Sequence, residues 1–188
     1  MLAIDSCETL LKDLTQRAGS LPVRIVNANL LEFRAQLAAP PDVILCMGDT
    51  LTHLRDQSSV EALFEDAASS LRPGGVFVAT FRDYDTTELK NAARFIPVRS
   101  DDERILTCCV EYADNTVTVH DLLHQLERGS WRLHAGSYRK LRSAPQWVEQ
   151  QLRTLGMAVV CDRVPGGMVR VVARKPPASA AARTAAGP

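Results

Sequence analysis

The sequence predicts an α/β fold: a doubly wound sheet of mainly parallel strands that carries an antiparallel β insertion. Three observations lead to this prediction. Up to Arg82, short apolar runs alternate with helical stripes, as in strands joined by crossover helices. Residues 42–47 and 76–81 are apolar almost throughout, which is typical of parallel strands covered on both faces. After Arg82, long alternating strands separated by turn residues replace this pattern.

The first part of the chain divides into strands and helices in regular order. The predicted strands are residues 2–4, 23–26, 42–47 and 76–81. The helix after the first strand has a predicted inner face of Leu10, Leu11, Leu14 and Ala18. A second helical stripe runs from Val60 to Leu71, and residues 30–37 are expected to form one or two helical turns.

The second part contains the insertion and the closing elements. Residues 104–142 are predicted to form a meander of three strands, at 105–112, 116–126 and 131–141. A helix from Pro145 and a hairpin across residues 157–173 are expected to complete a domain of residues 1–174. Residues 175–188 have no stripe and are expected to be a disordered tail.

The composition of the chain gives no support for several classes of function. The chain has 188 residues with 22 acidic and 22 basic side chains, so charge gives no reason to expect nucleic acid or a membrane surface as partner. No apolar run approaches the roughly 18 residues of a membrane span, and no signal peptide opens the chain. The five cysteines include no Cys-x-x-Cys pair. We therefore expect a cytoplasmic protein with reduced thiols and no metal.

Three segments of the chain are informative together: residues 2–14, residues 41–54 and residues 71–84, which contain Asp5, Gly48-Asp49 and Pro73-Gly74-Gly75. Together they resemble the class I S-adenosylmethionine (SAM)-dependent methyltransferases, in the small-molecule branch that is similar to glycine N-methyltransferase. "LAIDSCETLLKDL" (residues 2–14) resembles the second strand of that fold and the acid that follows it. "PDVILCMGDTLTHL" (41–54) resembles the fourth strand with its loop. "LRPGGVFVATFRDY" (71–84) resembles the turn and the fifth strand. The resemblance implies a Rossmann-like methyltransferase sheet, SAM as cofactor and a small-molecule acceptor.

The chain departs from this family at its start. A glycine-rich loop precedes the acid by roughly 20 residues in Rossmann-like units. Only four residues precede Asp5 here. We therefore expect a sheet that lacks its first strand, an N-terminally truncated form, and strands ending at Asp5 and Met47 that are not paired. The insertion then follows the fifth strand. An open sheet edge also favours homo-oligomers. The alternative is a non-catalytic module that binds a protein partner.

The resemblance implies roles for eight residues. Cofactor-binding roles fall to Asp5, Asn29, Met47, Gly48 and Asp49. A catalytic role falls to His53, and substrate contacts fall to Arg82 and Tyr84. A carboxylate at the end of a strand accepts both ribose hydroxyls, which is the role implied for Asp5. Its alternative is a helix N-cap with Glu8 completing a capping box.

The other candidate residues have structural alternatives too. Asp49 could be a turn residue, His53 a surface histidine, and Arg82 part of a solvated loop. His120 and His124 fall on one face of a strand, and His134 lies on the neighbouring strand. A metal site would need the three to converge, and a polar outer sheet face explains them better. Trp131 and Trp147 are expected in the core.

Overall fold

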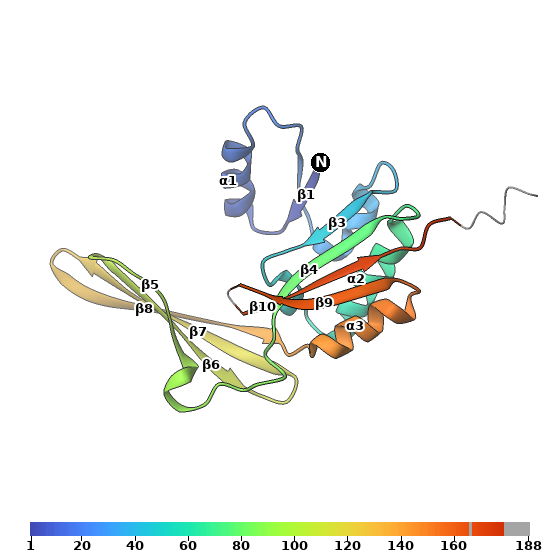
Figure 1. Cartoon of the computed structure of the whole chain (residues 1–188). Coiled ribbons are helices and arrows are strands. Elements are labelled where there is room, and N and C mark those ends of the chain that lie inside the picture. The colour runs from blue at the N-terminus through green and yellow to red at the C-terminus, as the bar shows by residue number, and fades with distance from the viewer. Residues whose placement is uncertain (166, 179–188) are drawn as a thin grey trace, which may run out of the picture.

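The structure is a computed structural model that describes residues 1–165 and 167–178. Figure 1 shows an N-terminal strand–helix–strand unit, a mixed sheet with helices packed against it, and an antiparallel sheet that projects away from them. This is the α/β plan predicted from the sequence. Residues 179–188 of the expected tail lie outside the described residues. Lys175, the first residue of that tail, donates its backbone N–H to the Gly75 carbonyl at 2.9 Å.

The N-terminal unit consists of two parallel strands and the helix that connects them. Its elements are β1 (Leu2–Asp5), α1 (Glu8–Ala18) and β2 (Arg24–Asn27). Leu11 is the one buried residue of residues 1–27, because a single helix covers little of a two-stranded sheet. The predicted inner face is wrong for Leu10, which is 58% exposed.

The mixed sheet has four strands in the order β3–β4–β10–β9. Their bounds are β3 (Val43–Cys46), β4 (Val76–Arg82), β9 (Ala158–Val164) and β10 (Met168–Arg174). β3 and β4 are parallel, whereas β10 is antiparallel to both of its neighbours. The predicted C-terminal hairpin forms, and its second strand lies between β4 and the first strand of the hairpin. Met47 and Arg82 therefore follow adjacent strands at the same edge of the sheet.

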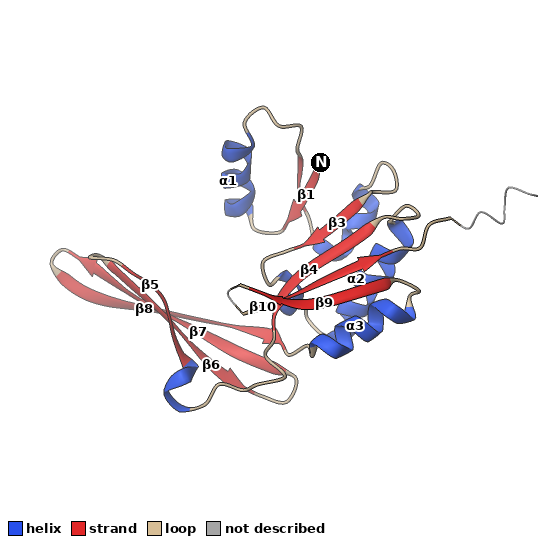
Figure 2. Cartoon of the chain, in the orientation of Figure 1, coloured by secondary structure: helices blue, strands red, loops and turns tan. Residues whose placement is uncertain are grey.

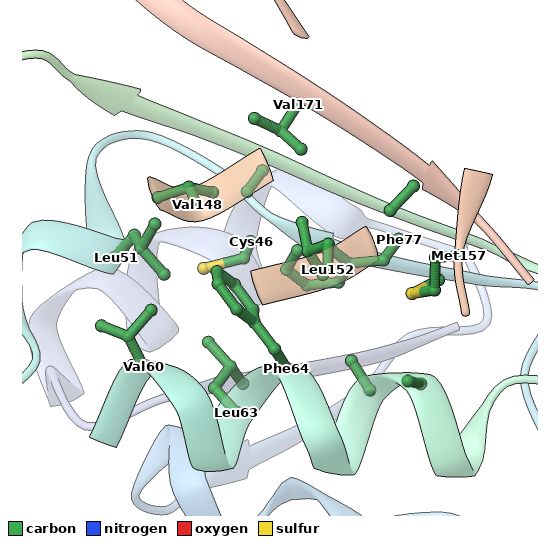
Figure 3. Packing of buried hydrophobic residues seen from close by; sticks show 14 of the residues in the cluster. Cys46, Leu51, Val60, Leu63, Phe64, Phe77, Val148, Leu152, Met157 and Val171 are labelled. Atoms are coloured by element: carbon green, nitrogen blue, oxygen red, sulfur yellow. The ribbon is translucent and has the colours of Figure 1, made fainter. Parts of the chain in front are cut away.

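The main core lies on one face of this sheet. α2 (Gln57–Ser70) and α3 (Pro145–Thr154) pack there, together with the 3₁₀ helix η1 (Leu30–Gln36). Figure 3 shows Phe64 of α2 directed at Phe77 of β4, and their ring centroids are 5.7 Å apart at 70°. A buried apolar face on each element provides the main stabilising contribution to such a layer.

Much of the opposite face of the mixed sheet is not covered by any described residue. Val43, Leu45 and Val160 are 52%, 60% and 66% exposed. The sequence-based expectation of helices on both faces of β3 is therefore wrong. The physical reason is that α1 packs against β1 and β2 instead of against the mixed sheet, so one layer of helices serves only one face.

The antiparallel sheet has four strands where the sequence analysis predicted three. After the 3₁₀ helix η3 (Asn91–Arg94), its strands are β5 (Phe95–Ser100), β6 (Arg104–Tyr112), β7 (Thr116–Glu127) and β8 (Ser130–Leu141). The predicted bounds of the last three are confirmed within one residue. β5 was missed because all of its side chains are exposed and a register shift between Pro97 and Arg99 breaks its alternation.

Both tryptophans were expected in the core, and one of them is not there. Trp147 of α3 packs against the main core, as predicted. Trp131 of β8 is 48% exposed, because its strand is an edge of the projecting sheet and nothing else of the described chain covers it. No described helix is long and apolar enough to cross a bilayer.

A gap separates β1 from β3. The two strands belong to different sheets, which confirms the prediction that the strands ending at Asp5 and Met47 are not paired. No strand of the described residues lies between them. A hollow of about 480 Å³ lies there, and its lining includes Ile4, Phe33 and Leu45. The unpaired edges of β1 and β3 therefore face each other across an apolar space.

Candidate active site

The candidate site begins where β3 and β4 end. Gly48 and Asp49 follow β3 with φ of 74° and 75°, so the chain turns sharply there. The turn is held by Thr80 of β4, whose hydroxyl accepts from Gly48 N–H at 2.9 Å and whose carbonyl accepts from Asp49 N–H at 3.1 Å. The turn leads into the 3₁₀ helix η2 (Thr50–His53). Strand carboxyl ends are where α/β sheets bind ligands.

Asp49 is buried and its carboxylate is fully engaged within the protein. One oxygen accepts from the Arg82 backbone N–H at 2.8 Å, and the other accepts from the ammonium of Lys140. Lys140 lies in β8, so this ion pair joins the antiparallel sheet to the loop after β3. The Lys140 nitrogen also lies 5.8 Å from the ring centroid of Tyr84 and 5.6 Å from that of Tyr138. These rings stabilise the charge by cation–π contact.

A cavity of about 420 Å³ lies between this loop, the end of β4 and the inner face of the antiparallel sheet. Its lining brings together four of the residues predicted for the site, namely Gly48, Asp49, Arg82 and Tyr84. Cys108, Val110 and Tyr112 from β6 and Tyr138 from β8 complete the side formed by the insertion. The predicted insertion is therefore a wall of the site.

His53 lies beside this cavity and does not line it. Its ring is stacked on Tyr138, with centroids 5.6 Å apart and planes at 23°. Burial against neighbouring atoms, and then the positive charge of Lys140, lower the pKa of His53, while Asp49 acts in the opposite direction. His53 is therefore neutral at pH 7, which is the form that accepts a proton.

The remaining three predicted residues lie at or just after the ends of β1, β2 and β3, outside the cavity. Asp5 is exposed after β1, where one carboxylate oxygen accepts from Cys7 N–H at 2.7 Å. It does not cap α1, whose N-cap is Cys7. Asn29 caps η1, since its side-chain oxygen accepts from Leu31 N–H at 3.0 Å. Met47 is half exposed after β3.

Sequence reasoning missed Lys140, Tyr138 and Cys108. One signal was available: Tyr138 and Lys140 fall on the same face of a predicted strand, because alternate residues share a face. The Cys108 thiol donates to Asp121 at 2.9 Å, and burial together with this bond raises its pKa to about 11. Cys108 is therefore an uncharged part of the cavity wall at neutral pH.

The three histidines of the antiparallel sheet do not converge. His120 pairs with Ser137 and His134 with Leu123, so strand alternation places His120 and His124 on one face and His134 on the other. His120 and His134 each hydrogen-bond to a glutamate, at 2.9 and 3.0 Å. In the part of the chain that the structure describes, no group of histidine, cysteine or acidic residues is placed to hold a metal ion.

Comparison with known proteins gives matches among solved structures only. No family model and no curated protein matches the chain. A SAM-dependent methyltransferase from Clostridium acetobutylicum aligns with a TM-score of 0.76 over 93% of this chain and 74% of that one, at 15% identity.

Two further solved structures also match most of this chain at low sequence identity. An amino pentose methyltransferase from Micromonospora echinaspora gives a TM-score of 0.76 over 93% of this chain and 73% of that one, at 13% identity. The CcbJ methyltransferase from Streptomyces caelestis gives 0.73 over 93% and 74%, at 20% identity. At such identities the likeness establishes the fold, which is the Rossmann-like α/β fold of these methyltransferases.

Proposed function

We propose that this protein transfers a methyl group from SAM to a small-molecule acceptor. The observation that carries the proposal is the cavity at the carboxyl ends of β3 and β4, with Asp49, Arg82 and Tyr84 in its wall. The fold shared with SAM-dependent methyltransferases supports it. The neighbours include a sugar N-methyltransferase and a glycopeptide N-methyltransferase, so this fold accommodates acceptors of several sizes.

The described residues fit one half of the cofactor. Asp5 has one carboxylate oxygen that takes no hydrogen bond from the described residues, and it is exposed at the end of β1, where it would accept from the ribose hydroxyls. Asn29 and Met47 end the neighbouring strands and would line the adenine side. Gly48 would allow close approach, since a Cβ added there meets no atom within 4 Å. None of these residues offers the run of backbone N–H groups that a glycine-rich loop provides.

The gap between β1 and β3 is where that loop would be required. Val43 and Leu45 of β3 are more than half exposed beside it, and the edges of β1 and β3 face it without strand partners. Unpaired backbone groups at an edge cost free energy unless another strand or water satisfies them. We propose that a further parallel strand with a glycine-rich loop fills this gap in the active protein.

The protein's own contribution to the reaction is positioning and proton transfer. SAM, when bound, would supply a sulfonium methyl group that passes in line to the nucleophile while the methyl–sulfur bond breaks and the neutral thioether S-adenosylhomocysteine leaves. Arg82 and Tyr84 hold the acceptor in the cavity, so that the reactants meet in one orientation with water excluded. His53, neutral at pH 7 and stacked on Tyr138 beside the cavity, is the candidate base for the proton that the acceptor loses, and a bridging water would have to carry that proton to it. The Asp49–Lys140 ion pair keeps the antiparallel sheet in place over the cavity.

Calorimetric titration with SAM tests the function directly. The 188-residue chain should bind SAM weakly, because the Asp5 carboxylate supplies about 1.5–3 kcal/mol, against roughly 8 kcal/mol for micromolar affinity. A longer form that carries a strand and glycine-rich loop ahead of Met1 should bind it tightly. In the longer form, Asp5→Ala should weaken binding about tenfold or more.

Glu127→Ala is the control, because it removes a partly exposed carboxylate, paired with Arg132 and His134, near the far turn of the antiparallel sheet. It should leave the affinity for SAM unchanged. Micromolar binding by the 188-residue chain would contradict the need for an added strand and glycine-rich loop. Absence of SAM binding by the longer form would contradict methyl transfer and favour a non-catalytic module that binds a protein partner in the gap.

A further inference from the structure

The charged residues in the wall of the 420 Å³ cavity differ in whether they have a partner of opposite charge. Four charged residues line it: Asp49, Arg82, Asp83 and Lys140. Asp49 is paired with Lys140, and Asp83 is paired with Arg163 at 2.6 Å. The Arg82 guanidinium has neither an ion pair nor a hydrogen bond among the described residues. Arg82 is therefore the surplus positive charge of the cavity.

The carboxylates of the cavity are already committed. Burial alone would raise the pKa of Asp83, but hydrogen bonds from Thr86, Arg163 and Asp85 outweigh it and hold that pKa below its usual value. Asp121 lies behind Cys108, whose thiol donates to it, and it does not line the cavity. A cationic ligand would therefore meet Arg82 without a free counter-charge in the wall.

Two phenol groups add hydrogen-bond donors next to Arg82. Tyr84 is 8% exposed, but its hydroxyl oxygen is not fully buried. This hydroxyl has no hydrogen-bond partner in the described part of the chain. The Tyr138 hydroxyl also has no such partner there. Burial raises the pKa values of Tyr84, Cys108 and Tyr138, and the positive charge of Arg82 counteracts part of this rise in all three. Both phenols remain protonated donors at neutral pH.

Most of the rest of the wall is apolar, although Thr87 and Tyr112 also line it. The apolar side chains are those of Leu89, Ile96, Val98, Val110, Val119 and Met168. Four of these residues belong to strands of the antiparallel sheet, and Met168 begins β10. A ligand therefore meets hydrogen-bond donors near the ends of β4 and β8 and an aliphatic surface toward β5, β6 and β7. Pockets of this kind fix orientation by a few polar groups and gain affinity from apolar contact.

We infer that the cavity binds an acceptor that carries a carboxylate on an otherwise apolar body. The carboxylate lies on the Arg82 guanidinium and the Tyr84 hydroxyl, and the apolar body lies against β5, β6 and β7. The inference that this ligand is the acceptor rests on the proposed methyl transfer. The binding chemistry itself does not require SAM. Arginine binds carboxylates through two parallel N–H donors, which also sets the orientation of the ligand.

The test compares 4-phenylbutyrate with its neutral amide, 4-phenylbutanamide, by calorimetry on the 188-residue protein without SAM. The acid should bind about tenfold or more tightly than the amide. Arg82→Gln should abolish this preference, and Tyr84→Phe should weaken binding of the acid about threefold to tenfold. Arg139→Gln is the matched control, because Arg139 is exposed and strand alternation directs it to the other face of β8.

Equal binding of acid and amide, or unchanged binding in Arg82→Gln, would overturn the inference. Competition by inorganic phosphate as effective as by 4-phenylbutyrate would overturn the part concerning the apolar body. Arg82→Lys keeps the charge and should keep part of the preference, which separates charge from a folding defect. Carboxylate binding without SAM binding in the longer form would refute the proposed function alone. SAM binding there without carboxylate preference would refute this inference alone.

Discussion

The N-terminal unit and the mixed sheet each contain two parallel strands joined through a helix, but they bury their side chains to different extents. β1 and β2 are parallel strands joined by a helix, and β3 and β4 are parallel strands joined by η2 and α2. In the first region only Leu11 is buried. In the second, α2 and α3 close over a continuous core that includes Phe64, Phe77 and Leu152.

The difference shows what a parallel strand pair needs. Parallel strands are stable when helices and further strands cover their faces and edges. β4 has β3 on one side and β10 on the other, whereas β1 has only β2. Ile4 of β1 reaches the main core, but only as a partly buried contact. We therefore expect the two regions to differ in stability, and four measurements test that expectation.

Native-state hydrogen exchange should show the largest contrast. Amides of β1 and β2 should open locally with a free energy at least ~3 kcal/mol below that of β4 and β10, or roughly a hundredfold less protection. The reason is that β4 and β10 open only when the main core unfolds. Equal protection in the two regions would show that they form one cooperative unit. A strand that fills the gap beside β1 should reduce this difference in amide protection.

Truncation of a buried side chain in each region sharpens the comparison. Phe64→Ala should lower the free energy of unfolding by about 3–5 kcal/mol, because it leaves a cavity against Phe77 in the main core. Leu11→Ala should change the main transition much less and instead increase exchange in β1 and β2. Urea denaturation followed by tryptophan fluorescence measures the main transition of both variants, since Trp147 packs against the main core. Hydrogen exchange measures the local opening of β1 and β2.

The ion pairs of the two regions should also differ. Lys140→Met leaves the buried Asp49 carboxylate without its counter-charge and should cost about 3 kcal/mol or more. Asp49→Asn combined with Lys140→Met should recover part of that loss. Lys12→Met removes a bridge to Glu8 whose side chains are both 71% exposed, and it should cost less than about 0.5 kcal/mol. A similar cost for both single variants, measured by denaturation, would refute the distinction.

The smallest effect concerns pH. The folded protein lowers the pKa of His53 below its ordinary value of 6.5, so the unfolded chain binds a proton that the folded chain resists. Stability from this source is therefore present above about pH 6.5 and declines as pH falls through the lowered pKa. The decline should be modest, since the side chain is exposed. His53→Gln should flatten the change in melting temperature between pH 7 and 5, and a steeper change would contradict the assignment.

Several features of the fold and the site were predictable from local patterns. Alternation and turn residues located β6, β7 and β8, and Arg128 and Gly129 adopt the positive φ of 51° and 78° that a tight hairpin turn requires. The end of a buried strand pointed to Gly48, Asp49 and Arg82 as ligand-side residues, and the structure gathers them at one cavity. These predictions succeed because periodicity and turn chemistry act over a few neighbouring residues.

Other features depended on which elements meet. The placement of β10 between β4 and β9, the bare face with Val43 and Leu45, and the opposite faces of His120 and His134 all follow from strand pairing and register. The ion pair between Asp49 and Lys140 joins residues 91 positions apart. By itself the sequence determined most of the elements, with β5 as the exception, and the residue types at the strand ends. Only the tertiary structure decided that Asp49 is paired with Lys140 and that Arg82 is left unpaired at the cavity. Pairing between residues so far apart in the sequence exists only once the two sheets are packed against each other.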